Sequence, residues 1–191
     1  MFKVLAVSGS PRKEGNTELL LQAALEPFVK GGHSIDKFYM SDKDVAPCTA
    51  CDACADDGVC VIKDDMNMFV EKLPTYDAIV MGSPVYSRNI SAQLLSLFNR
   101  LHCITHKRPF RDKICFGGAI AVGGSPNSQG ITLTVIHNHF LSLGVCCVPG
   151  VLNGVSVVAR AKGEVLSQPK SLRDAAALGE NMLRVLTKAK G

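Results

Sequence analysis

Hydrophobic residues along this chain occur in short continuous runs. Residues 3–10, 77–86 and 113–124 are largely apolar and lead into small or polar residues. Such runs are typical of strands that are buried on both faces, as in a parallel sheet. Residues 34–40 alternate between apolar and polar side chains like a strand, and residues 145–150 predict a further short strand. The pattern therefore predicts five strands, of which three are fully buried.

Between these runs, apolar residues recur every three or four positions, which predicts amphipathic helices. The expected helices cover residues 16–32, 64–74, 91–104, 129–144 and 171–190. Pro27 predicts a kink or an early end of the first helix, and Ser171 is the expected N-cap of the last one. One helical period of the fourth helix is marked by Ile131, Val135, His139 and Ser142.

Strands alternate with helices along the chain, which predicts an α/β sandwich with helices on both faces of a parallel sheet. The length of 191 residues suits a single domain, residues 1–191, and no internal repeat or low-complexity linker divides it. Residues 151–170 fit no element well. We expect them to form a hairpin or an arm that makes oligomer contacts.

Composition narrows the class of protein. Hydrophobic residues make up 47% of the chain and charged residues 20%, so a chain of this size can bury a core without disulfides. The net charge of +4 is small, Trp is absent and no basic stripe is interleaved with aromatic residues, so we expect no nucleic-acid partner. The first ten residues indicate a strand rather than a signal peptide, and residues 114–124 are too short a stretch to span a bilayer. We therefore expect a cytoplasmic protein with no membrane partner, in which thiols stay reduced.

The loops after the three buried strands form the expected ligand site, because open α/β sheets bind ligands beyond the carboxyl ends of their strands. In residues 8–17, hydroxyl, amide and guanidinium groups precede a helix N-terminus, an arrangement that suits a phosphate group. The alternative is an ordinary loop with a polar helix cap. This segment matches neither the P-loop nor the G-x-G-x-x-G pattern, so we expect neither an NTPase nor a dinucleotide-binding domain.

The other two loops suit an aromatic ring. In residues 82–89, Tyr86 offers a flat face. In residues 122–130, the paired Gly123 and Gly124 would let the backbone approach a ring closely. A phosphate site at one end and a ring site at the other favour a mononucleotide such as FMN.

Four of the eight cysteines follow one another with the spacing C-x2-C-x2-C-x5-C. The first three have the spacing of cluster ligands in bacterial ferredoxins. Cys60 is the expected fourth ligand, and Gly58 would help the chain to turn back toward it. Zinc is the main alternative, although structural zinc sites usually pair two C-x2-C knuckles across a longer spacer. Free or disulfide-linked thiols are a further alternative.

The other cysteines are expected to be structural, since buried free cysteine is common. They are Cys103, Cys115, Cys146 and Cys147. His102 and His106 have the i,i+4 spacing of a metal-binding pair, but no third ligand is evident from the sequence.

Three segments, "SGSPRKEGNT", "GSPVYSRNISAQLLSLFNR" and "VGGSPNSQG", resemble the flavin-binding loops of the NADPH-dependent FMN reductase family, a branch of the flavodoxin-like fold. With the cysteine motif, the chain resembles the iron–sulfur flavoproteins of anaerobic archaea and bacteria. The resemblance covers about residues 1–145 well. It implies a three-layer sandwich with a five-stranded sheet of order 2-1-3-4-5, and a cluster-binding loop, residues 47–61, inserted after the second strand.

The resemblance also implies the cofactors and their ligands. FMN would be bound by Ser8, Ser10, Arg12, Asn16 and Thr17 at its phosphate, by Ser83, Pro84, Val85 and Tyr86 beside its ring and ribityl chain, and by Gly123, Gly124 and Gly130 at its ring. A [4Fe–4S] cluster would be held by Cys48, Cys51, Cys54 and Cys60. The partners it implies are a ferredoxin-like electron carrier and further copies of the chain, in a homodimer or a homotetramer.

We expect an oxidoreductase in which the cofactors, not catalytic side chains, carry the chemistry. Electrons from a carrier such as ferredoxin would pass through the cluster to FMN and on to an acceptor. One alternative is an NAD(P)H-dependent FMN or quinone reductase whose cysteine loop holds a structural metal or is empty. Another is a non-catalytic module that senses flavin or redox state.

Overall fold

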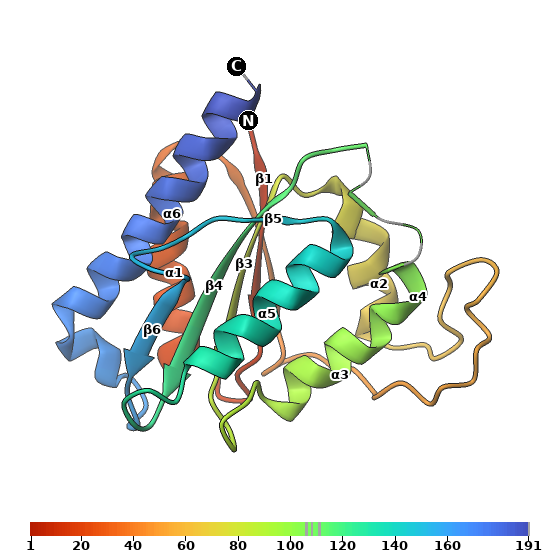
Figure 1. Cartoon of the computed structure of the whole chain (residues 1–191), viewed down its shortest axis with the longest axis horizontal. Helices are drawn as coiled ribbons and strands as arrows, with labels where there is room; N and C mark the ends of the chain where they lie inside the picture. The colour runs from red at the N-terminus through yellow and green to blue at the C-terminus, as the bar shows by residue number, and fades with distance from the viewer. Residues whose placement is uncertain (106, 108, 111, 191) are drawn as a thin grey trace.

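Parallel strands make up the sheet at the centre of the computed structural model, which describes residues 1–105, 107, 109–110 and 112–190 (Figure 1). Within these residues the strands are β1 (Lys3–Ser8), β2 (Ser34–Tyr39), β3 (Ala78–Pro84), β4 (Phe116–Gly123), β5 (Cys146–Cys147) and β6 (Val155–Val158). Their order is β2-β1-β3-β4-β5, which confirms the predicted order.

The strand β6 is the main departure from the predicted sheet. The first residues of β4 pair with β5 and its last residues pair with β6, so two short strands follow one another along the same edge of β4. Both pairings are parallel. Residues 151–170, for which the sequence predicts a hairpin or an arm, thus contribute a strand to the sheet. A contact between residues 151–170 and another subunit stays a prediction.

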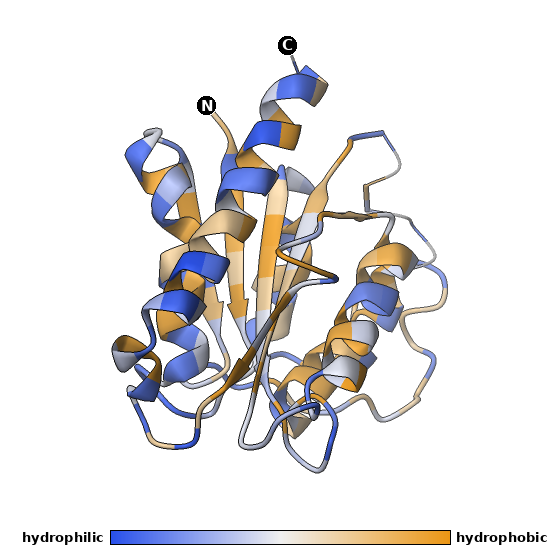
Figure 2. Ribbon diagram, turned by 60° about the vertical axis from the view of Figure 1, so that its left-hand side comes forward, coloured by the Kyte–Doolittle hydropathy of each residue, from blue (hydrophilic) through white to orange (hydrophobic). Residues whose placement is uncertain are grey.

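Helices cover both faces of the sheet. On one face lie α1 (Asn16–Lys30) and α6 (Pro169–Lys190); on the other lie α2 (Asp65–Lys72), α3 (Ala92–Arg100), α4 (His102–Thr105) and α5 (Gly130–Leu143) (Figure 1). Two 3-10 turns, η1 (Leu73–Thr75) and η2 (Glu164–Ser167), complete the described elements. Figure 2 shows apolar strands between helices that carry polar residues on their outer sides. The buried side chains form one core on each face.

Two helix boundaries differ from the prediction. The early end predicted at Pro27 does not occur, because α1 continues to Lys30 with Leu25 and Phe28 buried in the core; the alternative, a kink at Pro27, stays a prediction. Losing one backbone hydrogen bond at Pro27 is outweighed by that packing. The last helix begins at Pro169, before the predicted cap Ser171. Proline is favoured in the first turn of a helix because its fixed φ suits that position and its missing N–H would be unpaired there.

Among the helices that the structure describes, none has both the length and the apolar composition that a membrane span requires.

A buried carboxylate fastens α6 to the amino-terminal edge of the sheet. Asp77, the residue before β3, accepts hydrogen bonds from the backbone N–H of Lys3 (2.7 Å) and from the ammonium groups of Lys113 (3.0 Å) and Lys190. Burial favours a higher pKa for Asp77, but these hydrogen bonds and the charge of Lys113 hold its pKa below the usual 3.8. The ion pairs therefore stabilise the folded state while the carboxyl group is ionised.

We expect Asp77→Asn to lower the free energy of unfolding by about 1–2 kcal/mol near neutral pH, because the two lysines can still reach water. The folded-state pKa lies below the unfolded-state value of 3.8, so the carboxylate's contribution is fully present above that value and is lost as the pH falls through the folded-state pKa. Urea unfolding of both proteins across this pH range measures the difference. A difference that stayed constant down to the lowest pH would contradict the ion-pair assignment.

Candidate functional site

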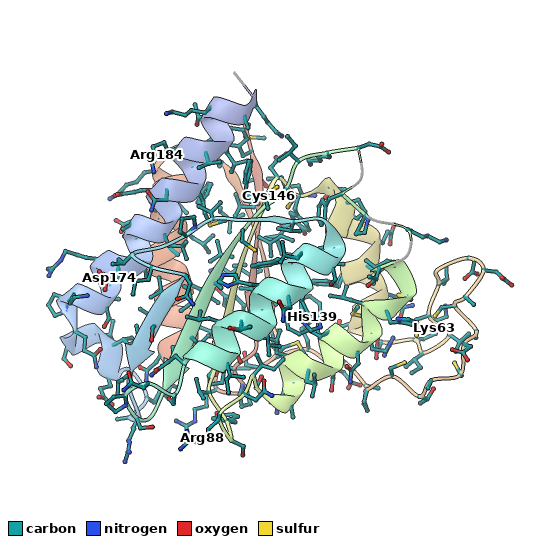
Figure 3. All side chains as sticks on the ribbon, viewed as in Figure 1. Lys63, Arg88, His139, Cys146, Asp174 and Arg184 are labelled. Carbon is teal, nitrogen blue, oxygen red and sulfur yellow. The ribbon has the colours of Figure 1, made fainter. Side chains whose placement is uncertain are left out.

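A cavity of about 420 Å³ lies at the carboxyl-terminal edge of the sheet, where the loops after β1, β3, β4 and β6 meet. Figure 3 shows Arg88 at this edge, on the loop that follows β3. The predicted flavin-site residues that line the cavity are Ser10, Arg12, Asn16, Thr17, Pro84, Val85, Tyr86 and Gly124. The predicted residues outside its lining are Ser8, Ser83, Gly123 and Gly130. The cavity volume is typical of a small-molecule site.

Serine hydroxyls shape the loop between β1 and α1. The backbone N–H of Arg12 donates to Ser10 Oγ (3.1 Å), and that of Ser10 donates to Ser8 Oγ (3.3 Å). Ser8 is fully buried, so its role is to brace the loop. The N-cap residue of α1 is Gly15, which offers no side-chain cap. The first N–H groups of a helix need partners, and a phosphate group can supply them.

The segment after β6 closes the same side of the cavity. Asn16 Nδ2 donates to the carbonyl of Ala161 (2.8 Å), and its Oδ1 accepts from the N–H of Val165 (3.3 Å). Arg12 Nη1 donates to the carbonyl of Arg160 (3.4 Å). Asn16 therefore joins the start of α1 to this segment, which is a structural role beside the predicted contact with phosphate.

In the loop after β3, Ser83 is buried and holds the backbone. Its hydroxyl donates to the carbonyl of Pro84 (2.8 Å) and accepts from the N–H of Ser91 (3.1 Å), the N-cap of α3. Tyr86 and Asn89 pair through two backbone hydrogen bonds that close a tight turn. The Tyr86 side chain stays partly exposed beside the cavity, where its ring can stack on a ligand.

The glycines after β4 have separate roles. Gly124 lines the cavity, and the side chain of Arg160 lies against it, with Arg160 Nε donating to the carbonyl of Gly124. The close approach of a ring to this glycine stays a prediction. A side chain at Gly123 would collide with Ser128 and Gln129, so this glycine permits the loop to fold on itself. Gly130 is the first residue of α5 and has open space around it.

Several lining residues were missed from the sequence. They are Gly15, Val122, Ser125, Ala159, Arg160 and Lys162. The last three follow β6, within a segment that had been assigned to no element. The three valines of Val155–Val158 are the available sequence signal for the short strand that delivers them to this edge, because β-branched residues favour strands.

The cavity fits a mononucleotide. Arg12, Arg160 and Lys162 supply three cationic side chains around the N-terminus of α1, which matches a dianionic phosphate. Val85 and Tyr86 supply apolar and aromatic surface at the other loop. The contacts of the individual residues with FMN stay predictions.

A second cavity, of about 460 Å³, lies between the cysteine loop and the outer sides of α3, α4 and α5. All four motif cysteines line it, and all eight cysteines of the chain are free thiols. In Figure 1 the loop extends beside α3 and α4, away from the sheet. Sulfur donors alone suit an iron–sulfur cluster or zinc. Among the described His, Cys, Asp and Glu side chains, no three are already arranged around a metal position.

The cysteine loop turns through several left-handed residues. Gly58 has a φ of +73°, which confirms that it helps the chain to turn, and Ala50 and Asp52 also have positive φ values. Such positions place successive backbone N–H groups toward the thiols. The N–H of Ala53 and the side chain of Thr49 lower the pKa of Cys51, which favours its thiolate form.

Cys103 lies behind the loop, where it lines one cavity of about 270 Å³ with Cys54 and another of about 390 Å³ with Cys60. Burial and then the nearby Cys54 and Cys60 raise the pKa of Cys103 to about 11. A neutral, buried thiol fits the structural role predicted for it. His102 also lines the cysteine cavity, while His106, its predicted pair member, lies outside the described residues.

The predicted period on α5 does not mark its buried side: Ile131 and Ser142 are exposed, and Val135 and His139 are half-buried, with Val135 packed against the core. The buried residues of α5 are Thr132, Leu133, Ile136, Phe140 and Leu143. Apolar residues lie all around this helix, so their period could not identify the buried side. Of these four residues, His139 and Ser142 line the cysteine cavity, and His139 stacks on Phe98 with ring centroids 3.7 Å apart.

Two cysteines expected to be buried are exposed. Cys115 is fully buried, as expected, but Cys146 and Cys147 form the two-residue strand β5 and face solvent. Figure 3 shows Cys146 on the outer segment that follows α5. Such a short edge strand leaves its side chains uncovered.

Comparison with known proteins places this architecture among flavoproteins. The sequence model of the NADPH-dependent FMN reductase family matches residues 2–157. An iron–sulfur flavoprotein of Methanocaldococcus jannaschii is 36% identical over 190 residues, which are 97% of each chain. An iron–sulfur flavoprotein of Methanosarcina thermophila is 42% identical over 138 residues, 72% of each chain.

Solved structures confirm the fold. A flavodoxin, WrbA-like protein from Agrobacterium tumefaciens superposes with a TM-score of 0.67 at 15% identity, over 98% of this chain and 99% of its own. A flavodoxin from the domain Archaea superposes with a TM-score of 0.57 at 14% identity, over 94% and 98%. At this identity the likeness shows a flavodoxin-like fold and nothing more specific.

Proposed function

This chain belongs to the NADPH-dependent FMN reductase family, and from that membership we propose that it is an FMN-containing iron–sulfur electron-transfer protein. Relatives that carry the name iron–sulfur flavoprotein match most of its length. In the proposed reaction, a carrier such as ferredoxin supplies electrons through a [4Fe–4S] cluster to FMN, and FMN supplies them to an acceptor.

The observation that carries this proposal is that all four motif thiols line one cavity of a domain that also has a mononucleotide-sized cavity. FMN exchanges one or two electrons and a [4Fe–4S] cluster exchanges one, so a protein that binds both can join one-electron and two-electron couples. A structural zinc ion would explain the thiols but would add nothing to the flavin's chemistry.

The chain's own residues position these groups. Arg12, Arg160 and Lys162 would neutralise a phosphate bound near the N-terminus of α1. Tyr86, exposed on the loop after β3, would offer its ring to the flavin. Cys48, Cys51, Cys54 and Cys60 would bind iron as thiolates. The homodimeric or homotetrameric state and the cytoplasmic location stay predictions from the sequence.

Reduction rates under anaerobic conditions separate the proposal from its alternatives. We expect reduced ferredoxin to bleach the flavin absorbance of the holoprotein much faster than NADPH or NADH, and Cys51→Ser to abolish that advantage. Rapid bleaching by NAD(P)H that is unchanged in Cys51→Ser would instead identify an NAD(P)H-dependent reductase. A bound flavin that neither donor reduces would identify a sensing module.

A further inference from the structure

Arg100, at the end of α3, is one of the largest fully buried side chains of the described protein. A guanidinium group stays charged inside a protein, so its burial demands specific partners. Four of its contacts are made by its two terminal nitrogens. Nη1 donates to Asp64 Oδ2 (2.7 Å) and Nη2 to Asp64 Oδ1 (3.1 Å), which makes a two-point ion pair.

The same two nitrogens join the two ends of the cysteine loop. Nη1 also donates to the carbonyl of Ala46 (3.0 Å), just before the loop, and Nη2 to the carbonyl of Ile62 (3.2 Å), just after it. The carboxylate of Asp64 accepts from the N–H of Ala46 (3.0 Å). Arg100 and Asp64 therefore close the base of the loop with side chains that are not themselves metal ligands.

The helix that follows the loop, α2, also holds Cys60, the last cysteine of the motif. Asp64 is the N-cap of α2, where it accepts from the N–H of Met66 (3.0 Å) and pairs with Asn67 in a capping box. The side-chain amide of Asn67 donates to the carbonyl of Cys60 (3.2 Å). Cys60, the ligand at the longer spacing, is thereby fixed relative to Arg100.

One hydrogen-bond donor of Arg100, its Nε–H group, has no acceptor among the described residues, although it is buried. Burial alone would lower the pKa of Arg100, but hydrogen bonding and charge from Asp64 raise it, and the charge and hydrogen bonding of the Cys60 thiol add to that rise. A buried donor without an acceptor destabilises the folded state. Sulfur atoms that carry negative charge at Cys60 would supply the acceptor.

We propose that Arg100 is a positioning residue for the iron–sulfur site: it closes the base of the cysteine loop before any iron is bound, and its unpaired Nε–H and positive charge are available to negatively charged sulfur at Cys60. This inference rests on the proposed function, because it assigns the charged sulfur to a bound cluster. A fixed cation and an N–H···S hydrogen bond stabilise the reduced cluster, which carries one more negative charge. Lysine would keep the charge but could not make the forked contacts.

The test compares the anaerobic holoprotein with Arg100→Lys. We expect the variant's reduction equilibrium at the cluster to shift about tenfold toward the oxidised form, about 59 mV for a one-electron couple, with the FMN potential unchanged. We expect a chelator to remove iron from Arg100→Lys about 10-fold faster than from the wild-type holoprotein. In the iron-free chain, amide hydrogen exchange of residues 46–64 should be faster than in the iron-free wild type.

Asp77→Asn is the matched control, because it breaks another buried ion pair at the amino-terminal edge of the sheet. It should lower global stability and leave the cluster potential, iron release and loop exchange unchanged. Should Arg100→Lys fail to fold, Asp64→Asn keeps the guanidinium and a good N-cap while it weakens the closure. That variant should still release iron faster and exchange its loop amides faster.

An Arg100→Lys protein with bound iron and wild-type values for all three measurements would overturn the inference. If Arg100→Lys does not fold, wild-type iron release and loop exchange in Asp64→Asn would do the same. Both results leave the proposed function intact. A wild-type protein that binds FMN but no iron under anaerobic conditions would instead refute the proposed function.

Discussion

Cys60→Ser is expected to lose nearly all iron and acid-labile sulfide while it retains FMN. A cubane cluster is usually held by four cysteine thiolates, and a serine hydroxyl binds iron far more weakly than a thiolate. Cys60 comes after the longer spacing, and its carbonyl is held by Asn67, so no other residue of the loop can take its place without moving the backbone. Iron, sulfide and flavin analysis of anaerobically purified protein measures the result.

Cys103→Ser is the matched control for this experiment. Cys103 lies beside Cys54 and Cys60 but is buried behind the loop, with its pKa raised to about 11 by burial and by those two thiols. We expect this variant to keep its iron. Loss of iron from Cys103→Ser with retention in Cys60→Ser would move the fourth ligand from the loop to α4.

Arg12→Ala is expected to weaken FMN binding by about 10- to 100-fold, since a charge-assisted hydrogen bond to phosphate contributes about 1.5–3 kcal/mol. Arg12 lines the cavity beside the N-terminus of α1. Lys13 is the next residue, is also exposed, and does not line the cavity, which makes Lys13→Ala the matched control. Fluorescence titration of the flavin-free proteins with FMN gives both affinities.

If Arg12 binds the phosphate group, its replacement should matter less for a ligand that has no phosphate. The loss in Arg12→Ala should shrink when riboflavin, which lacks the phosphate, replaces FMN as the ligand. Equal weakening by Arg12→Ala and Lys13→Ala would show that the effect is one of general surface charge, and would contradict a phosphate site at this loop.

Most of the sheet could be predicted because continuous apolar runs identify strands buried on both faces. The short strand β5 was also predicted, within residues 145–150, but β6 was not. It is four residues long and continues along the edge of β4 that β5 begins, so it needs no hydrophobic run of ordinary length. Its pairing depends on β4, which is distant in the sequence, and no local pattern indicates that pairing.

In the candidate site, too, residues that follow a predicted strand could be identified, and residues that depend on distant strand pairing could not. The loops after β1, β3 and β4 could be identified from their composition, since each follows a recognisable strand. Arg160 and Lys162 could not, because the strand that carries them to the cavity was not predicted. Ser8 and Ser83 resemble ligand-binding hydroxyls in the sequence, yet both are buried and bonded to the backbone.

The cysteine spacing predicted the thiol-lined cavity, but not what holds the loop. Arg100 lies forty positions after Cys60, the last cysteine of the motif, and in the sequence it resembles an ordinary final residue of an amphipathic helix. Its contacts with Ala46, Ile62 and Asp64 exist only because α3 packs against both ends of the loop. A buried charge of this kind is visible in the structure and invisible in the sequence pattern.

The stoichiometry of cofactors in anaerobically purified wild-type protein tests the central claim most directly. We predict one FMN per chain together with about four iron and four acid-labile sulfide, the composition of a [4Fe–4S] cluster, and an absorption spectrum that contains both flavin and iron–sulfur bands. A protein with full FMN content and zinc, or no metal, in place of iron and sulfide would contradict the claim.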